Sequence, residues 1–388
     1  MRRDIEYLAS DALEGRGTGT RGNDSAAMFA ARRYASLGLR PLLPDYLQQF
    51  QARSAMLAHT GGLGAVQTQN IVALLRGRDA SLQGQFIVIG AHIDHLGRST
   101  AGALDPEAGD AIRNGADDNA SGTAAVWELA RLFSTHPTRH SLIFANFSGE
   151  ELGLLGSQYF VDHPPVSLDS VVAMINFDMV GRMRHDSLIV YGVRTATELP
   201  ALLDSANARL GLHVVGIGDG FGPSDQSSFY AKNIPVLHFF TNLHEDYHRA
   251  TDDADKINAA GEARVIAVAE RVVRELDRRD AHLTFVRAAA PAPVAARTGS
   301  NVYLGSIPDM SAAGAQGLRL SGVRPGSPAD SAGLKAGDVV VEFGGKEVTD
   351  LQSYSDALYS HQPGEEVDVV VLRAGDRVKL KVRLGRRG

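Results

Sequence analysis

Two glutamates, Glu150 and Glu151, stand side by side in the stretch NFSGEELGLLGS, directly after the apolar run SLIFA. The pattern predicts a buried strand that gives way to a helix at this point. Taken alone, the pair is typical of the acidic first turn of a helix. At the end of a buried strand, however, repulsion and loss of hydration oppose two like charges. A bound cation would offset both of these costs.

Further acidic residues and histidines follow other apolar runs. They lie in the segments GAHIDHLG, NGADDNASG, MINFDMVG and HEDYHRATDD and comprise His92, Asp94, His95, Asp117, Asp118, Asp178, His244, Asp246, Tyr247 and His248. The chain has no cysteine, so any metal must be held by oxygen and imidazole ligands, which suit Zn²⁺. Two ions that share one carboxylate could activate a water and polarise a carbonyl at the same time.

The elements that must position these residues alternate between strands and helices. Apolar runs and amphipathic patterns follow one another up to a long predicted helix over residues 259–279. This alternation predicts an α/β fold with a mostly parallel central sheet flanked by helices. In such a sheet the carboxyl ends of the strands share one edge, so we expect the acidic residues and histidines to converge there.

A change of composition predicts a second domain. Residues 287–300, RAAAPAPVAARTGS, are rich in Ala and Pro and indicate a linker. Short strands and glycine turns follow it. We therefore expect a catalytic domain over residues 1–286 and a small β-rich domain over residues 301–388.

Composition narrows the class of protein. The 388 residues are 44% hydrophobic and 22% charged, as in soluble globular proteins. The net charge of −6 argues against a nucleic-acid surface or a polybasic membrane patch. No apolar run approaches the length of a membrane span, and the N-terminus shows no signal-peptide pattern. The compartment therefore stays open between the cytoplasm and a chain that begins after processing.

The motifs GAHIDHLG, GADDNASG, SGEELGLLGS, NFDMVG and DYHRATDD occur in this order. Together they resemble the co-catalytic zinc aminopeptidases of the bacterial leucyl aminopeptidase and aminopeptidase Y type. Glutamate carboxypeptidase and the glutaminyl cyclases are related to these enzymes. The resemblance implies the zinc-peptidase fold, peptide substrates with a free N-terminus and a periplasmic or secreted enzyme.

The resemblance also implies a metal site. It implies two Zn²⁺ ions, although Mn²⁺ or Co²⁺ would suit the same ligand types. The metal ligands would be His92, Asp118, Glu151, Asp178 and His248. Asp118 would bridge the two ions, and alignment to DNASG favours it over Asp117. The sequence YH followed by TDD favours His248 over His244 as the last ligand.

Three further residues would carry the chemistry in such an enzyme. Asp94 would orient the imidazole of His92, and Glu150 would be the general base. Tyr247 would donate to the oxyanion of the tetrahedral intermediate. Asp178 would be among the carboxylates that hold the free amine of the substrate. The family often has a cis peptide bond after the bridging aspartate.

The sequence departs from the family pattern at two places. Related bacterial enzymes often carry SDH before a Phe, whereas Gln226 stands in GPSDQSSF, which puts a contact of the substrate pocket in doubt. Many relatives also have a protease-associated insert, for which residues 50–69 leave no room.

The C-terminal region resembles a circularly permuted bacterial PDZ domain in VYLGSI and SGVRPGSPADSAGLKAGDVVVEFGGKEV. The resemblance implies a groove between a strand and the helix DLQSYSDALYS that binds peptide or protein C-termini. The backbone of Val302, Tyr303, Leu304 and Gly305 would hold the peptide carboxylate. A tethered domain without a ligand is the alternative.

Two alternatives to an aminopeptidase stay open. A carboxypeptidase or a glutaminyl cyclase could use the same fold, but a carboxypeptidase needs arginines around the substrate carboxylate. Arg182 is the only obvious basic residue beside the motifs. A non-catalytic scaffold that recruits partners through its PDZ domain is the other alternative, although every ligand position carries a suitable residue.

Overall fold

The chain divides into two compact units in the computed structural model. One comprises Met1–Asn242 with Asp246–Ala289, and the other comprises Leu243–Glu245 with Ala290–Gly388. The predicted linker lies outside the described residues except for Arg287, and the boundaries at residues 286 and 301 stay a prediction. The described residues are 1–54, 64–222, 224–287, 302–308, 317–323, 326–349, 353–354, 357–358 and 360–386.

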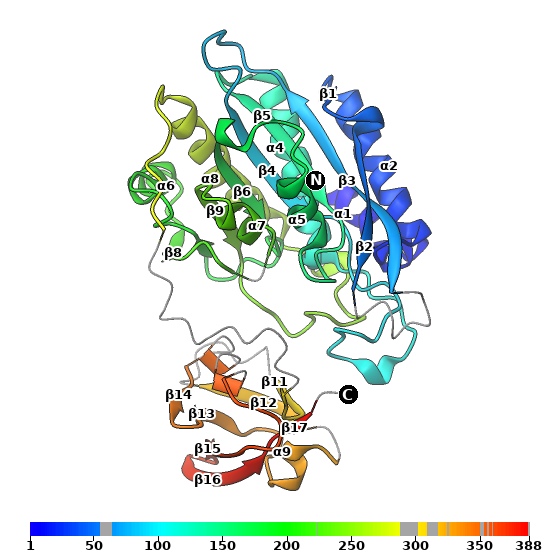
Figure 1. The fold of residues 1–388 in the computed structure, drawn as a ribbon, viewed down its shortest axis with the longest axis vertical. Coiled ribbons are helices and arrows are strands. Elements are labelled where there is room, and N and C mark those ends of the chain that lie inside the picture. The colour runs from blue at the N-terminus through cyan, green and yellow to red at the C-terminus, as the bar shows by residue number, and fades with distance from the viewer. Residues whose placement is uncertain are drawn as a thin grey trace. The chain divides into compact units, whose positions relative to one another are not determined.

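A nine-stranded sheet runs through the first unit (Figure 1). Its order is β1-β3-β5-β4-β6-β9-β7-β8, with β2 paired to β3. The strands are β1 (Arg40–Pro41), β2 (Leu47–Arg53), β3 (Ala65–Leu75), β4 (Phe86–His92), β5 (Ser141–Phe147), β6 (Val171–Phe177), β7 (Ser187–Tyr191), β8 (His213–Ile217) and β9 (Val236–Phe240).

The centre of this sheet is parallel, as the alternating pattern predicts. The pairs β5–β4, β4–β6 and β6–β9 all run parallel, and so does the outer pair β7–β8. The flanks are mixed, because β3 is antiparallel to β5 and β7 is antiparallel to β9. The predicted α/β fold is therefore confirmed, with a parallel core between antiparallel neighbours.

Helices cover both faces of the sheet (Figure 1). Ile87 and Ile89 of β4 point into the layer of α1, α2, α4, α6 and α8, whereas Val88 points into the layer of α5 and α7. This alternation follows from the two-residue period of a strand. The helices are α1 (Arg2–Leu8), α2 (Arg21–Ser36), α4 (Gly122–Thr135), α5 (Leu155–Asp162), α6 (Leu199–Asn207), α7 (Gln226–Ala231) and α8 (Ala259–Asp277).

Local signals fix where the longer helices begin. The side chain of Thr20 accepts from the N–H of Asn23 at the start of α2, and Asn258 accepts from the N–H of Gly261 at the start of α8. Such caps satisfy backbone donors that have no partner within the helix. Shorter helical turns are η1 (Asp11–Arg16), η2 (Pro44–Tyr46), η3 (Pro106–Ala108), η4 (Ala116–Ser121), η5 (Leu168–Ser170) and η6 (Ala254–Lys256).

The second unit has its own core and its own sheet. Its main sheet has the order β11-β12-β13-β15-β16, with β14 paired to β13, and β10 pairs separately with β17. Within the predicted helix DLQSYSDALYS, the described residues 353–354 and 357–358 are helical, and Ser360 lies in a turn. The elements are β10 (Val302–Tyr303), β11 (Ser306–Pro308), β12 (Leu318–Val323), α9 (Pro328–Ser331), β13 (Val339–Phe343), β14 (Lys346–Glu347), β15 (Glu366–Arg373), β16 (Asp376–Arg383) and β17 (Gly385–Arg386).

None of the helices among the described residues combines the length and the apolar character that crossing a membrane requires.

Candidate metal centre

The carboxyl ends of the four central strands carry the candidate ligands. His92 is the last residue of β4, Glu150 and Glu151 follow β5, and Asp178 follows β6 directly. His248 lies in the loop between β9 and α8. The parallel register brings these strand ends to one edge, so residues more than 150 positions apart meet there.

Asp118 lies between two imidazoles. Its Oδ1 is 3.3 Å from Nε2 of His92, and its Oδ2 is 3.1 Å from Nε2 of His248. The carboxylate is 3% exposed. Each oxygen thus faces a different imidazole, which is the arrangement expected of a carboxylate that bridges two cations. The peptide bond after Asp118 is cis, in line with the resemblance.

Each of the two imidazoles that contact Asp118 also has a second carboxylate beside it. Asp178 Oδ1 lies 3.4 Å from Nε2 of His92, and Glu151 Oε2 lies 3.2 Å from Nε2 of His248. His248, which the sequence favoured over His244, thus meets both Asp118 and Glu151. The five predicted ligands form two sets that share Asp118.

His95 joins the second set, although the sequence assigned it no role. Its Nδ1 is 2.7 Å from Oε1 of Glu151 and 3.8 Å from Oδ2 of Asp118. A Cβ at Gly115 would come within 2.5 Å of the His95 ring, so the ring is packed tightly against this glycine. His95 and His248 thus contact different oxygens of the Glu151 carboxylate, and together they fix its orientation.

Backbone carbonyls hold both ligand imidazoles. Nδ1 of His92 is 3.1 Å from the carbonyl oxygen of Asp94, and Nδ1 of His248 is 2.9 Å from that of Gly102. A carbonyl can only accept, so each Nδ1 carries a proton and each Nε2 is left to face the carboxylates. Asp94 therefore contacts the imidazole of His92 through its backbone carbonyl, while its carboxylate lies 3.8 Å from the same Nδ1 and the orienting role predicted for it stays a prediction.

The carboxylate of Asp94 links other parts of the site. It accepts from Oγ1 of Thr18 at 2.7 Å and from the N–H of Glu150 at 3.2 Å. The side chain of Asp94 thus binds Thr18 and the turn of Glu150, while its backbone carbonyl is the group that holds His92. Asp94 is fully buried and thereby ties the end of β4 to the turn that carries Glu150.

The loop that presents Asp118 is braced from two sides. Asp252 accepts through Oδ2 from the N–H groups of Asp117 and Asp118, at 2.9 and 3.1 Å. Asp117 accepts through Oδ1 from the hydroxyl of Ser121 and from the N–H of Gly181. Asp117 is therefore occupied in joining two loops, and the choice of Asp118 as the bridging candidate agrees with this geometry.

The two adjacent glutamates have different electrostatic surroundings. Burial would raise the pKa of Glu151, but the charge and hydrogen bond of His248 outweigh it and set that pKa at about 2. Burial, together with the charges of Glu151 and Asp178, raises the pKa of Glu150 well above its usual range, although His92 opposes the shift. The two residues lie in the turn that connects β5 to α5, which begins at Leu155, so the strand gives way to a helix here as predicted, but the pair precedes the first turn of that helix.

Negative charge also acts on the imidazoles and on Tyr247. Burial opposes protonation of His92, but Asp178 and Glu150 outweigh it and hold its pKa well above the usual value. Glu151 and Asp118 do the same to His248. Burial and the surrounding carboxylates raise the pKa of Tyr247, so its phenol keeps its proton. The Tyr247 ring stacks on that of His248, with centroids 3.9 Å apart.

The residues fit a metal ion. Nε2 of His92 and Oδ1 of Asp178 are buried and make no hydrogen bond, although they lie 3.4 Å apart. Among the described residues, three groups place ligand atoms within 4.8 Å of one another: His92 with Glu150 and Glu151, His92 with Asp118 and Asp178, and His95 with Asp118 and Glu151. Imidazole and carboxylate ligands of this kind suit Zn²⁺.

A layer of buried polar residues lies behind Asp178. Asn176 donates to Oγ of Ser224 at 2.9 Å and lies 3.2 Å from Nδ1 of His238. Gln226, the departure from the family pattern, accepts from Asn176 at 3.3 Å and is fully buried. Burial raises the pKa of the neighbouring Asp225 to about 7, against the opposing effect of His92. Gln226 therefore contacts Asn176, which stands two positions before Asp178 in the chain.

Arg182 is engaged by an acidic residue of the same loop as His248. Its Nη2 donates to Oδ2 of Asp246 at 2.5 Å, and Lys256 and Thr251 bind Oδ1 of the same carboxylate. This ion pair ties the loop after β6 to the segment that carries Tyr247 and His248.

Four residues near the candidate ligands were not predicted from the sequence: Arg16, Thr18, Asp225 and Asp252. Thr18 and Arg16 lie in EGRGTGT, near the N-terminus and far in sequence from every motif. Asp252 belongs to the sequence TDD, which favoured His248 as a ligand. That motif was the one feature of the sequence that could have pointed to Asp252. Arg16 bonds to backbone carbonyls, which are present at every residue and leave no trace in the sequence.

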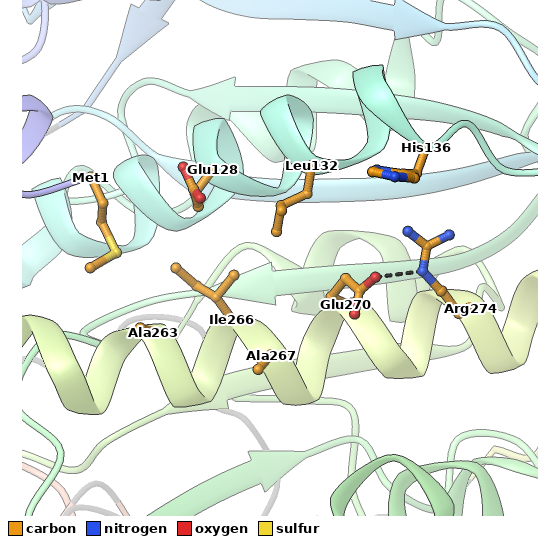
Figure 2. A pocket seen from close by; sticks show the side chains of 9 residues that line it. All are labelled: Met1, Glu128, Leu132, His136, Ala263, Ile266, Ala267, Glu270 and Arg274. Carbon is orange, nitrogen blue, oxygen red and sulfur yellow. Dashed lines mark hydrogen bonds and ion pairs between the residues drawn. The ribbon is translucent and has the colours of Figure 1, made fainter. Parts of the chain in front are cut away.

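A hollow elsewhere on the first unit is distinct from this cluster. It lies between α4 and α8 beside Met1 (Figure 2). Its lining is Met1, Glu128, Leu132, His136, Ala263, Ile266, Ala267, Glu270 and Arg274. None of these is a candidate ligand, and Glu270 and Arg274 form an ion pair with each other.

Comparison with known families agrees with the motifs. The model of peptidase family M28 matches residues 70–273, and the model of the PDZ domain matches residues 300–384. The C-terminal region is thus a PDZ domain, as predicted.

Related proteins have been described in bacteria. The chain is 31% identical over 191 residues to leupeptin-inactivating enzyme 1 of Streptomyces exfoliatus, a match that covers 48% of this chain and 38% of that protein. It is 28% identical over 176 residues to aminopeptidase YwaD of Bacillus subtilis, covering 42% of this chain and 38% of the relative. The matches span well under half of the length of these relatives.

Solved structures share the fold. A zinc aminopeptidase from Bacillus subtilis superposes with a TM-score of 0.58 at 17% identity, over 74% of this chain and 97% of that one. Fimbriiglobus ruber glutaminyl cyclase gives 0.58 at 19% identity, over 70% and 93%. At such identities the similarity establishes the fold.

The pKa shifts of His92 and His248 predict how metal binding depends on pH. Both imidazoles bind protons in the metal-free protein below their raised pKa values, and a metal ion must displace those protons. Zinc affinity should therefore fall as the pH is lowered, by about tenfold per unit for each proton displaced. Calorimetry at pH 7 in buffers of different ionisation enthalpy should detect proton release, and pH-independent binding without release would contradict the assignment.

Proposed function

Because the chain belongs to peptidase family M28, we propose that it is a zinc-dependent aminopeptidase that removes N-terminal residues from peptides. Two ions would be held by the five residues around Asp118. His92 and Asp178 would bind one ion, His248 and Glu151 would bind the other, and Asp118 would bind both. Mn²⁺ or Co²⁺ could occupy the same ligands.

The position of Asp118 carries this proposal. Its two oxygens lie within 3.3 Å of two different imidazoles, and each imidazole has its own second carboxylate. A single ion would need only one of these sets. The symmetry of the cluster around one carboxylate therefore supports two ions.

The reaction needs a base, and Glu150 is placed for that role. Its Oε2 lies 4.0 Å from Nε2 of His92, whereas the carboxylates of Asp118 and Asp178 lie closer to that nitrogen. Glu150 is therefore next to the proposed ligands of the first ion without being one of them. Bound zinc would lower the pKa of a water and polarise the substrate carbonyl. Glu150 would take a proton from the water as the water oxygen attacks the carbonyl carbon. It would then give the proton to the amide nitrogen as the C–N bond breaks.

Two further groups would orient the substrate. The protonated phenol of Tyr247 would donate a hydrogen bond to the oxyanion that develops on the carbonyl oxygen. The positively charged N-terminus of the peptide would be held by carboxylates of the cluster, including Asp178. This attraction would select peptides with a free amine.

The engagement of Arg182 disfavours a carboxypeptidase. Asp246 binds its Nη2 and leaves its buried Nη1 without a hydrogen-bond partner among the described residues, which opposes a bidentate pairing of both nitrogens with the carboxylate of a substrate. A glutaminyl cyclase shares the fold and stays an alternative, as does a non-catalytic scaffold. The cyclase would require an N-terminal glutamine, whereas a scaffold would bind no zinc.

The proposal can be tested with chromogenic substrates. Leucyl anilide should be hydrolysed by the purified chain, activity should be lost with a chelator, and zinc should restore it. N-acetyl-leucyl anilide is the matched control and should be a poor substrate, because it lacks the free amine. Cleavage of N-acyl dipeptides, or pyroglutamate formation without hydrolysis, would instead support the carboxypeptidase or the cyclase.

Matched variants of the two glutamates separate the base from the ligand. Glu150→Gln should keep about two zinc ions per chain but lose about 10²–10⁴ in kcat, because it removes the proton acceptor. Glu151→Gln should lose zinc, since its carboxylate faces His248 and has a pKa of about 2. Zinc content and kcat of both proteins are the measurements, and similar mild effects would rule out the division of roles.

For the second unit we propose that the PDZ domain binds peptide C-termini. Gly305 adopts a φ of +83° immediately before β11, a conformation that side chains rarely adopt. Among the described residues, β11 pairs only with β12, which leaves it as an edge strand to which a peptide could add. Val302 and Leu304 anchor the preceding segment in the core. The N–H groups of residues 302–305 would meet the peptide carboxylate.

Fluorescence anisotropy with labelled peptides tests this role. Peptides with a free carboxyl terminus should bind the full chain at least about tenfold more tightly than the same peptides with an amidated terminus, because charge-assisted hydrogen bonds would be lost. Equal binding of the two forms would exclude carboxylate recognition.

A further inference from the structure

Arg16 is an arginine buried completely inside the first unit. It is the last residue of η1 and follows the glycine in EGRGTGT. Its Nε donates to the carbonyl of Ile93 at 2.9 Å, and its Nη1 and Nη2 donate to the carbonyls of Asn114 and Gly115 at 2.7 and 2.9 Å. Nη1 also donates to the carbonyl of Leu8.

Three of those acceptors belong to the segments that carry His92 and Asp118, and the fourth, Leu8, is the last residue of α1. Ile93 stands between His92 and Asp94, and Gly115 begins the turn that leads to Asp118. One planar guanidinium thus joins the end of β4 to the loop before α4. Because the fork of an arginine is rigid, it sets the separation of the carbonyls it binds.

The backbone around Arg16 strengthens the same connection. The N–H of His95 donates to the carbonyl of Arg16 at 3.3 Å, and that of Gly97 donates to the carbonyl of Gly15 at 3.1 Å. Thr18 bonds to the carboxylate of Asp94. A Cβ at Gly15 would come within 2.2 Å of the carbonyl oxygen of Arg113, so only glycine fits there.

The charge of Arg16 also acts on the cluster. Burial lowers its pKa to about 10, against the effects of Asp118, Asp94, Asp252 and Glu151, so it stays charged at neutral pH. All its hydrogen bonds go to backbone carbonyls, so Arg16 forms no ion pair with any single carboxylate among the described residues. Its positive charge instead acts on all four of these carboxylates from a distance.

We propose that Arg16 is a positioning residue of the metal centre, which fixes the bridging Asp118 relative to His92 and keeps a permanent positive charge behind the ligands. This inference rests on the metal site proposed above. A buried arginine that served only the core would stabilise the fold without affecting metal affinity. The two roles therefore differ in a measurable quantity.

Arg113 provides a matched comparison, because it is also fully buried and also binds carbonyls. Its Nε donates to Asp105 at 2.8 Å, and its other nitrogens bond to the carbonyls of Asp105, Ser99, Gly109 and Ala111. The loop that it folds supplies the Gly102 carbonyl to His248. Loss of Arg113 should thus disturb the ion at His248, whereas loss of Arg16 should disturb both.

The test is zinc affinity of the full chain, measured by competition with a chelator for wild type, Arg16→Lys, Arg16→Met, Arg113→Lys and Leu276→Ala. Leu276 is buried in α8 and belongs to the core of the first unit. Its variant therefore controls for an effect of lower folding stability on zinc affinity. Arg16→Lys should weaken both zinc equivalents by about 10- to 100-fold, because lysine keeps the charge but not the fork. Arg16→Met, which loses the charge as well, should weaken them further.

Arg113→Lys should weaken one equivalent, and Leu276→Ala should bind zinc like the wild type despite a lower Tm. The visible spectrum of bound Co²⁺ should change in Arg16→Lys, which reports ligand geometry independently of turnover. Wild-type affinity in Arg16→Lys, or an equal loss in Leu276→Ala, would overturn the positioning role while leaving the metal site intact. A wild-type chain that binds no zinc would overturn the proposed function and this inference together.

Discussion

The contact of Asp118 with two imidazoles is the constraint on which the rest of the site depends. A carboxylate whose oxygens face His92 and His248 at 3.3 and 3.1 Å concentrates charge in a place that is nearly closed to water. Asp178 and Glu151 add further negative charge on either side. Such a cluster is costly unless cations or protons offset it, because burial disfavours isolated ions. The raised pKa values of both imidazoles express this demand for positive charge.

The fold holds the candidate ligands in place even without a bound cation. The parallel centre of the sheet brings the ends of β4, β5, β6 and β9 to one edge. Loops from these ends would be free to separate under their own repulsion, and hydrogen bonds oppose that movement. Asp252 holds the backbone at Asp118, Asp94 holds the turn of Glu150, and carbonyls hold both imidazoles. Preorganisation of this kind raises metal affinity because little ordering remains to be done on binding.

The sequence predicted candidate ligands that the fold brings together, but it did not predict the residues that hold them in place. Carboxylates and imidazoles after apolar runs have distinct chemical types, and the parallel sheet they predict explains why they meet. The preference for Asp118 over Asp117 and for His248 over His244 agrees with the geometry. The antiparallel flanks depend on pairing across distant segments, which periodicity does not encode. Arg16 reaches a carbonyl 98 residues away, and since every residue has a carbonyl, its partner carries no signature.

The adjacent glutamates show how neighbours in sequence acquire opposite proton affinities. Glu151 turns toward His248 and His95, whose ring nitrogens lie 3.2 and 2.7 Å from its two oxygens, and its carboxylate stays ionised. Glu150 has one imidazole at 4.0 Å, and the charge of Glu151 acts on it in addition to burial. Ionisation of the first residue therefore raises the pKa of the second. A cation bound by Glu151 would remove part of that repulsion and bring the pKa of Glu150 back toward the range in which a carboxylate accepts and returns a proton. The low pKa of one glutamate and the raised pKa of the other are thus two results of the same charge balance.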